Sequence, residues 1–397
     1  MKKIAIVVQR YGKEIVGGSE SLTMQYAVKL KEYYDVDVLT TTCFDYITWD
    51  NYYPEGITII DDIKVNRFKT YNQKKKNEFE LLISKQLDKI NSNEPTELKD
   101  DNNWISYQGP YCPELLSYIS ENQHNYNAFI FMTYLYYPFV YGLPLVAYKS
   151  LIVPTAHDEP WIKFKLYKNI FCIPKFICFL TDEEKDFVHN LFGNQYIKWN
   201  ITGAGIEVPK AVNPDDFKKR YNIKGKYIVY LGRLDESKGV ANLIEYFDEY
   251  KKLYPSEIQL VLIGSGPLEI PKRDDIVPVG FVNEQDKFNG IAGAEIMISS
   301  SKYESLCIAL LEGLALGVPA LVNGECEVLK GHIVKSKTGY YYTNQEEFIN
   351  AAHELLSSED SNKEMREKAV EYISNNYTWD KVIKKLCEAI EYACCDI

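Results

Sequence analysis

The chain has 397 residues, of which 46% are hydrophobic and 25% are charged. A single hydrophobic core rarely grows beyond about 250–300 residues, so this length predicts a globular protein of two domains. The formal net charge of -11 speaks against wholesale binding to nucleic acid, which requires a basic face.

The cysteines and the apolar segments favour a cytoplasmic protein. The nine cysteines form neither a CxxC pair nor a Cys/His set with zinc spacing, and scattered thiols fit a reducing compartment. The apolar run at residues 4–8 is too short for the core of a signal peptide. No stretch of about 20 apolar residues is present to span a bilayer.

The first half begins with strand, loop, helix and strand. Residues 4–8 are typical of a buried parallel strand, 19–30 have helical spacing, and 36–41 form the next predicted strand. Such a βαβ unit has a ligand-sized turn after its first strand. Residues 70–107 are polar and predict helices with a loose loop near 91–103. Three buried strands and one helix that Thr181 caps follow, at 129–134, 151–154, 177–180 and 182–191.

The second half repeats this alternation. Residues 199–209 contain two glycines and a proline, and we place the domain junction there. Beyond it, strands are predicted at 227–231, 259–263, 276–279, 295–299 and 320–322. Helices are predicted at 240–254, 306–316 and 379–395. Two successive doubly wound α/β domains account for the whole pattern.

Glu304 and Glu312 form the most informative constellation. Glu304 precedes a predicted helix, and Glu312 lies on it among apolar residues, where a carboxylate is costly unless something bonds it. Two helical turns separate the acids by about 12 Å, which is too far for a glycosidase pair but suits two parts of one long ligand. The helix N-terminus at Ser305, Leu306 and Cys307 offers N–H groups to a phosphate. The alternative is a capped amphipathic helix with an incidental acid.

Arg233 and Lys238 follow the predicted strand 227–231, at the edge where doubly wound sheets bind ligands. Two cations five residues apart fit a pyrophosphate, although two solvated surface charges are the alternative. Gly264 and Gly266 follow the next buried strand and let the backbone approach a ligand, but many turns carry glycine.

The first half offers weaker candidates. Gly17 and Gly18 open the first helix and provide an anion site, yet no GxGxxG follows the first strand, which speaks against a nicotinamide enzyme. His157 follows a predicted strand and could contact a reacting sugar, although a lone histidine is more often structural. Asp35 and Asp37 match a DxD metal signature but lead into a buried strand, so we interpret them as strand-edge residues.

Together these motifs resemble the family 4 glycosyltransferases, retaining enzymes of the GT-B fold, over nearly the whole chain. The similarity rests on GRL-x3-KG at 232–239, GxG at 264–266, Gly-Phe-Val at 280–282 and the E-x7-E pair at 304 and 312. It implies two Rossmann-like, doubly wound parallel-sheet domains that face a central cleft, at 1–202 and 203–376. A C-terminal helix at 377–397 would pack back on the first domain.

The resemblance implies a role for each matching residue. Arg233 and Lys238 would neutralise the donor pyrophosphate, Glu304 would hold the transferred sugar, and His157 would contact it. Glu312 would accept hydrogen bonds from the ribose hydroxyls. The other donor-binding residues would be Gly17, Gly18, Gly264, Gly266, Phe281, Val282, Ser305, Leu306 and Cys307. Neither a metal nor another cofactor would be needed.

Two segments depart from the family pattern. Residues 323–327, Asn-Gly-Glu-Cys-Glu, stand where Gly-Gly-x-Pro-Glu is common, and Ser-Leu-Cys at 305–307 replaces the more usual Ser-Phe-Gly. Neither change removes a charged group. Both concern the donor pocket, so the identity of the donor stays open.

The implied function is sugar transfer from a nucleoside-diphosphate sugar to a glycan, lipid-linked or small-molecule acceptor, in polysaccharide or surface-glycan biosynthesis. Aromatic runs at 133–139 and 161–179 could stack on acceptor sugars, although packing in the core is the alternative. The second run also carries lysines, which suggests peripheral contact with the anionic inner face of a membrane. Alternative functions are an epimerase or a phosphorylase on the same scaffold, or a sugar-nucleotide-binding partner without turnover.

Overall fold

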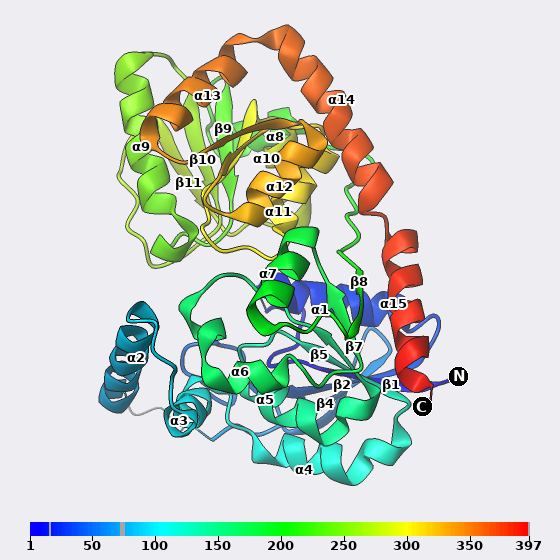
Figure 1. Ribbon diagram of the computed structural model, residues 1–397. Coiled ribbons are helices and arrows are strands. Elements are labelled where there is room, and N and C mark those ends of the chain that lie inside the picture. The colour runs from blue at the N-terminus through cyan, green and yellow to red at the C-terminus, as the bar shows by residue number, and fades with distance from the viewer. Residues whose placement is uncertain (16, 72–75, 396–397) are drawn as a thin grey trace. The chain divides into compact units, whose positions relative to one another are not determined.

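The computed structural model describes residues 1–15, 17–71 and 76–395 (Figure 1). The chain folds into two units, of which the first is discontinuous in sequence. It comprises Met1–Gly203 and Val382–Ile397, whereas the second is Ala204–Lys381. Each unit has its own sheet and its own core.

The first unit is built on an eight-stranded sheet with the order β3-β4-β2-β1-β5-β6-β7-β8, in which β3 alone runs antiparallel to its neighbour. Its strands are β1 Lys3–Val7, β2 Asp35–Thr41, β3 Gly56–Ile60, β4 Ile63–Phe68, β5 Ala128–Met132, β6 Ser150–Val153, β7 Phe176–Phe179 and β8 Lys198–Ile201. The chain moves outward from β1 to β2 and returns to β5 on the other side of β1. This reversal marks the carboxyl end of β1 as a ligand-binding edge.

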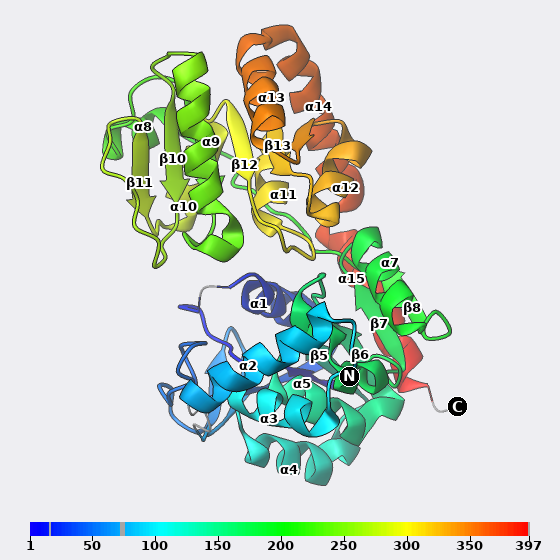
Figure 2. The same ribbon diagram turned by 60° about the vertical axis from the view of Figure 1, so that its left-hand side comes forward.

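Helices cover both faces of this sheet (Figures 1 and 2), and α7 among them begins at a side-chain cap. Thr181 caps α7 as predicted, because its side chain accepts a hydrogen bond from the Glu184 N–H. The helices are α1 Gly18–Leu30, α2 Lys76–Asn91, α3 Leu98–Gln108, α4 Pro113–Asn122, α5 Tyr137–Gly142, α6 Lys165–Ile170 and α7 Asp182–Phe192. Helix α15, Trp379–Cys394, begins in the second unit and runs along β8 and β7 of the first (Figures 1 and 2).

The two aromatic runs of the first unit form its core. Tyr134 and Phe139 of the first run, and Phe164, Tyr167 and Phe171 of the second, are almost completely buried. The acceptor-stacking interpretation of these rings is therefore wrong. Phe139 and Tyr167 belong to α5 and α6 themselves, and the other rings flank these helices. Lys165 and Lys168 on α6 are exposed, as the period of an amphipathic helix requires.

The second unit has a six-stranded parallel sheet with the order β11-β10-β9-β12-β13-β14. Its strands are β9 Tyr227–Leu231, β10 Gln259–Ile263, β11 Ile276–Gly280, β12 Ile296–Ser299, β13 Ala320–Asn323 and β14 Gly339–Tyr342. Its helices are α8 Pro214–Arg220, α9 Val240–Leu253, α10 Glu284–Ala292, α11 Ile308–Ala315, α12 Glu327–Ser336, α13 Gln345–Ser357 and α14 Glu359–Asn376. Alternate residues of β9 enter separate cores on the two faces.

Several elements differ from the predicted ones. Strands β3, β4, β8 and β14 were not predicted, and helix α3 begins at Leu98, inside the segment expected to be a loop. Residues 72–75 of the predicted polar helical segment lie outside the described residues. Helix α11 begins at Ile308, so Ser305, Leu306 and Cys307 form the loop before it.

Candidate functional site

The second unit brings two loops together at the reversal point of its sheet. Strands β9 and β12 are neighbours, although β10 and β11 separate them in sequence, and ligands bind at such points. The Ser300 hydroxyl, just after β12, donates a hydrogen bond of 2.8 Å to the Lys238 carbonyl in the loop after β9. Gly239 permits this approach, because a Cβ there would lie 2.3 Å from the Ser300 carbonyl oxygen and its φ is +70°.

An ion pair between Lys238 and Glu304 joins these loops. Lys238 Nζ lies 2.6 Å from Glu304 Oε1, and the two side chains are only 26% and 17% exposed. Burial lowers the pKa of Lys238, but the charge and hydrogen bond of Glu304 outweigh burial, so the net pKa is raised. Lys238 is therefore cationic at neutral pH. One predicted cation and the predicted sugar-holding carboxylate meet at this point.

Asp235 orients both predicted cations, and sequence reasoning missed it. Its Oδ2 atom lies 3.0 Å from Arg233 Nε. Its Oδ1 atom accepts a hydrogen bond of 3.0 Å from the Lys238 N–H. The Arg233 side chain is 44% exposed, so solvent reaches its guanidinium. The sequence signal that could have located Asp235 is its place as N-cap of the short helix Glu236–Lys238.

The loop before α11 explains one departure from the family pattern. Cys307 is the N-cap of α11 and has a φ of 63°, in the left-handed region that glycine adopts without strain. The more usual glycine at this position therefore matches the backbone that the loop requires. Burial raises the pKa of the Cys307 thiol to about 12, so the thiol stays protonated at neutral pH. Leu306 beside it is buried.

His332 on α12 supports this loop through a hydrogen bond, and no sequence pattern around it indicates this role. Its Nε2 atom lies 2.9 Å from the Leu306 carbonyl oxygen, and its Nδ1 atom lies 3.0 Å from the Tyr372 hydroxyl. A carbonyl can only accept, so Nε2 carries the proton and Nδ1 accepts from Tyr372. Burial lowers the pKa of His332 to about 4, which keeps the ring neutral.

This buried histidine predicts a pH-dependent stability. Its pKa in the unfolded chain is about 6.5, so the unfolded chain takes up the proton at a higher pH than the folded protein does. The free energy of unfolding should therefore fall as pH decreases from about 6.5 to about 4, by about 3 kcal/mol in total. His332→Gln can still donate to the Leu306 carbonyl and should lose this part of the profile. Urea unfolding of both proteins between pH 4 and pH 8 measures the difference.

The comparison with the variant is necessary because Glu184 acts in the opposite direction. Burial raises the pKa of Glu184 to about 8, so its contribution to stability decreases as pH rises toward that value. That contribution is the same in both proteins and cancels in the difference. Parallel stability profiles for wild type and His332→Gln would contradict the assigned neutral state.

Glu312 has the partner that its apolar surroundings demand. Lys287 on α10 lies 2.7 Å from Glu312 Oε1, and both side chains are about 15% exposed or less. Burial raises the pKa of Glu312, and the Lys287 charge opposes that effect. Lys287 also lies 3.0 Å from the exposed Glu284. A ligand hydroxyl that bonds Glu312 would therefore share the carboxylate with Lys287, a residue that sequence reasoning missed.

The glycines after β10 serve contacts within the protein. A Cβ at Gly264 would lie 1.9 Å from the Gly232 carbonyl oxygen, and one at Gly266 would lie 2.2 Å from the Leu234 carbonyl oxygen. The contact between two backbone segments explains why these positions are glycine, and their predicted approach to the donor stays a prediction. Phe281 follows β11 at the same sheet edge and is 69% exposed, and Val282 is partly buried.

Two alanine substitutions compare a glycine whose Cβ would clash with the backbone, Gly264, and a glycine beside open space, Gly18. Gly264→Ala should destabilise the protein by more than about 1 kcal/mol, because its φ is +138° and the carbonyl that it meets cannot move freely. Gly18→Ala should leave the melting temperature unchanged or slightly raised, because a Cβ there meets nothing within 4 Å. Differential scanning fluorimetry of both variants measures the effects. Equal melting temperatures would contradict the backbone contact at Gly264.

In the first unit, Gly17 and Gly18 lie beside a buried ion pair. Glu20 accepts hydrogen bonds of 3.0 Å from Arg10 Nε and from Gln9, and Arg10 Nη2 also contacts it. A Cβ at Gly17 would lie 2.2 Å from Glu20 Oε2, so this glycine makes room for the carboxylate. Arg10 neutralises Glu20, which leaves the start of α1 without a net charge from this pair.

His157 lies in the loop after β6. Its Nδ1 atom is 3.6 Å from Glu159 Oε1, and the side chain is 25% exposed. Glu184 anchors this loop, because it accepts hydrogen bonds of 2.6 Å from the N–H groups of Ala156 and Leu180. The structure thus brings Arg233, Lys238 and Glu304 together within the second unit, whereas Gly17, Gly18 and His157 belong to the first.

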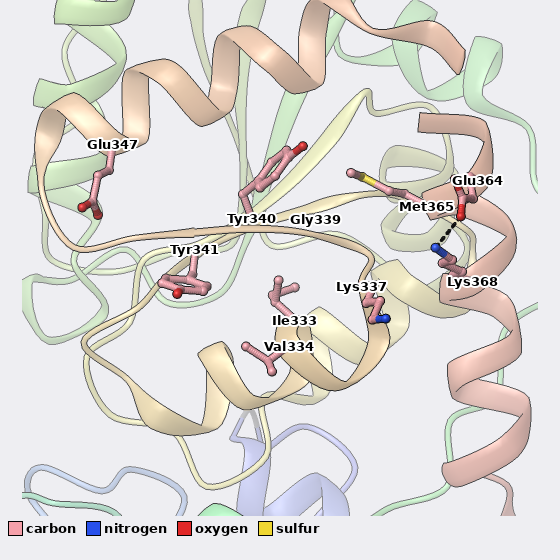
Figure 3. A pocket seen from close by; sticks show the side chains of 10 residues that line it. All are labelled: Ile333, Val334, Lys337, Gly339, Tyr340, Tyr341, Glu347, Glu364, Met365 and Lys368. Atoms are coloured by element: carbon pink, nitrogen blue, oxygen red, sulfur yellow. Dashed lines mark ion pairs between the residues drawn. The ribbon is translucent and has the colours of Figure 1, made fainter. Parts of the chain in front are cut away.

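One hollow in the second unit lies away from all of these residues. It has a volume of about 700 Å³ and follows strand β14, with Tyr341 and Val334 toward α12 and Glu347 at its far end (Figure 3). Lys368 and Glu364 form an ion pair of 2.5 Å at its other end (Figure 3). None of the predicted site residues lines it.

The described residues, 1–15, 17–71 and 76–395, contain neither a candidate metal-binding cluster nor a helix able to span a membrane. No group of three or more His, Cys, Asp or Glu side chains there could hold a metal ion. Asp37 of the DxD pattern is buried in β2, where Lys3 lies 3.0 Å away and Tyr126 donates a hydrogen bond of 2.8 Å. No helix in these residues combines the length and the apolar character needed to cross a membrane.

Residues 213–372 match the family described as "Glycosyl transferases group 1". The match lies within the second unit, Ala204–Lys381, and does not extend to the first. Arg233, Lys238, Glu304 and Glu312 lie inside the matched residues, whereas Gly17, Gly18 and His157 lie outside them. The resemblance inferred from the motifs is therefore confirmed for the part of the chain that carries most of them.

Curated relatives of the group 1 domain are distant and partial matches. N-acetyl-alpha-D-glucosaminyl L-malate synthase of Bacillus anthracis is 28% identical over 189 residues, which are 44% of this chain and 48% of that protein. Alpha-monoglucosyldiacylglycerol synthase of Acholeplasma laidlawii is 24% identical over 131 residues, which are 30% of this chain and 32% of that protein. The chain thus spans less than half of the length of each of these two relatives.

Solved structures match the chain over its whole length. Sucrose-phosphate synthase from Thermosynechococcus elongatus has a TM-score of 0.72 at 13% identity and covers 98% of both chains. HepE of Anabaena, solved in complex with UDP and glucose, has a TM-score of 0.71 at 14% identity and covers 98% of this chain and 100% of that one. The fold prediction is confirmed: the chain has the GT-B fold.

Proposed function

We propose that the protein is a retaining glycosyltransferase that transfers a sugar from a nucleoside-diphosphate sugar to a glycan, lipid-linked or small-molecule acceptor. The observation that carries this proposal is the Lys238–Glu304 pair at the reversal point of a doubly wound sheet, with Arg233 in the same loop as Lys238. A paired cation and carboxylate can bind a diphosphate and a sugar hydroxyl side by side. Sugar transfer is also the activity for which the family is named.

The proposed chemistry assigns a task to each side chain. Arg233 and Lys238 stabilise the negative charge that grows on the diphosphate as its bond to the anomeric carbon breaks. Glu304 accepts a hydrogen bond from the transferred sugar, and Glu312 from the ribose. The acceptor oxygen bonds to the anomeric carbon on the face that the diphosphate leaves, and its proton passes to the leaving phosphate. His157 contacts the sugar, and Phe281 borders the base.

Peripheral membrane contact, if the acceptor is lipid-linked, would rest on charge alone. The rings of Phe164, Tyr167 and Phe171 are buried and cannot insert into a membrane. Lys165 and Lys168 are exposed. We propose a weak, salt-sensitive attraction of these lysines to the anionic inner face. Flotation with vesicles that contain phosphatidylglycerol tests it, and equal recovery with neutral vesicles would rule it out.

A thermal-shift panel of nucleoside diphosphates and their sugars tests the function. A ligand that binds only the folded protein raises the melting temperature by mass action. Uridine nucleotides form the first arm, because two similar structures carry UDP or UDP-2-fluoro glucose. No shift with any uridine, guanosine, adenosine or thymidine diphosphate would overturn the proposal.

A turnover assay then separates the alternatives. The donor found in the panel is incubated with and without candidate acceptors, and with inorganic phosphate. Acceptor-dependent release of the nucleoside diphosphate supports transfer. Release of free epimerised sugar without an acceptor would identify an epimerase, dependence on phosphate would identify a phosphorylase, and binding without turnover would identify a non-catalytic partner.

A further inference from the structure

A group of exposed hydrophobic side chains, three of them aromatic, lies in the loop after β2 of the first unit. Phe44, Tyr46, Ile47 and Tyr52 are 39%, 38%, 57% and 66% exposed. We call these four residues the aromatic ledge. Phe44 and Tyr52 touch, with ring centroids 5.2 Å apart. The ledge thus exposes its rings to solvent, whereas most rings of the aromatic runs at 133–139 and 161–179 are buried.

The ledge is held rigidly. Asp45 Oδ2 accepts hydrogen bonds of 2.8 and 2.6 Å from the N–H groups of Ile47 and Thr48. The Tyr52 N–H donates a hydrogen bond of 2.9 Å to the Thr42 carbonyl, which closes the loop at its base. The buried Trp49 donates through Nε1 to the Gln108 carbonyl at 2.6 Å. A rigid loop loses little conformational entropy when a ligand binds, so these rings form a prepared surface.

Arg10 connects the ledge to the start of α1. Its Nη1 atom donates a hydrogen bond of 2.8 Å to the Phe44 carbonyl, and its guanidinium lies 5.2 Å from the centre of the Tyr46 ring. The same side chain binds Glu20, close to Gly17 and Gly18. Since β1 and β2 are adjacent parallel strands, the ledge and the glycine turn share the carboxyl edge of the sheet.

The chemistry of the ledge selects its ligand. A sugar ring has an apolar C–H face, which stacks on aromatic rings, and a rim of hydroxyls, which donate hydrogen bonds. Asp50 and Glu55, next to these residues in the sequence, are exposed and can accept such bonds, although Glu55 also lies 4.0 Å from Lys69. Their charges disfavour an anionic lipid surface or a phosphate, and the Arg10 charge is already neutralised by Glu20.

We propose that the aromatic ledge binds a sugar ring of the acceptor. The word acceptor rests on the proposed function, whereas sugar binding at the ledge can be measured without it. Under this proposal the substrate that receives the transferred sugar carries at least one pyranose ring, so the acceptor is itself a glycan or a glycosylated molecule.

Saturation-transfer NMR with methyl glycosides of glucose, galactose, mannose and N-acetylglucosamine tests the proposal directly. We expect saturation of the C–H protons of at least one glycoside by the wild-type protein. Tyr46→Ala and Tyr52→Ala should each weaken that binding by about fivefold, the scale of one lost aromatic stack. Tyr33→Ala is the matched control, because Tyr33 is 53% exposed just beyond the far end of α1.

Three results would overturn the proposal. They are no saturation of any glycoside by wild type, equal saturation by the ledge variants, and binding of the ledge to something else. The last would appear as vesicle flotation, or as a dimer in sedimentation, that Tyr52→Ala abolishes. A thermal shift with the nucleoside diphosphate should be unchanged in the ledge variants, and its loss there would assign the rings to the donor. If wild type binds a glycoside but no nucleotide, the proposed function fails while the sugar site stands.

Discussion

Lys238→Ala is expected to lower kcat for sugar transfer by about 10²–10³, the usual effect of removing one preorganised charge that stabilises a transition state. The lysine is held 2.6 Å from Glu304 and by the Ser300 contact to its own backbone. Its removal takes away a cation that is fixed before the reaction begins. It also leaves the mostly buried Glu304 carboxylate without its partner. The unpaired negative charge repels a diphosphate and therefore weakens its binding.

Steady-state kinetics with the donor found by the nucleotide panel measures this effect. Lys252→Ala is the matched control, because Lys252 is 69% exposed on α9 and its removal should change kcat less than about twofold. Circular dichroism confirms that both variants are folded. Turnover of Lys238→Ala within threefold of wild type would remove this lysine from the proposed chemistry.

Phe171→Ala is expected to lower the free energy of unfolding by about 3–5 kcal/mol. The ring is fully buried, stacks on Phe192 with centroids 4.4 Å apart, and also touches Tyr134 and Tyr167. Truncation removes these contacts and leaves a cavity that neighbouring aromatic rings are too stiff to fill. An effect of this size would confirm that the ring belongs to the core and not to a membrane-facing patch.

Lys168→Ala provides the control from the same segment. The lysine is exposed on α6, so its loss should change stability by less than about 0.5 kcal/mol. Urea denaturation of the two variants and wild type gives the comparison. A Phe171→Ala variant as stable as Lys168→Ala would show that the ring is not packed as described.

The sequence predicted the parts of the fold that are local. The β-branched run at β1 and the Thr181 cap carry their own signals, and both were found where expected. Strand β3 escaped notice because it is a short edge strand whose Ile57 and Ile59 side chains are exposed. The aromatic runs were ambiguous because a ring that stacks on a sugar and a ring that packs in a core have the same sequence pattern.

Part of the candidate site was predictable from the sequence, whereas Asp235, Lys287 and His332 were not. Arg233 and Lys238 follow a strand, so their place at the sheet edge could be inferred. The pairing of the site residues could not be inferred, because Glu304 lies 66 residues from Lys238 and Lys287 lies 25 residues from Glu312. His332 reaches Leu306 across 26 residues. Such contacts depend on how elements pack, and a single sequence carries no periodic signal for them.

The discontinuity of the first unit has a consequence for synthesis on the ribosome. Residues of the second unit emerge as one uninterrupted stretch, whereas the first must wait for α15, whose Leu386, Ala389 and Ile390 are fully buried. Until α15 has emerged from the ribosome, the apolar surface that this helix covers stays uncovered. The first unit therefore begins to be synthesised before the second but can finish folding only after it. Nascent chains halted before residue 382 should stay bound to a chaperone for a longer time than the full chain does.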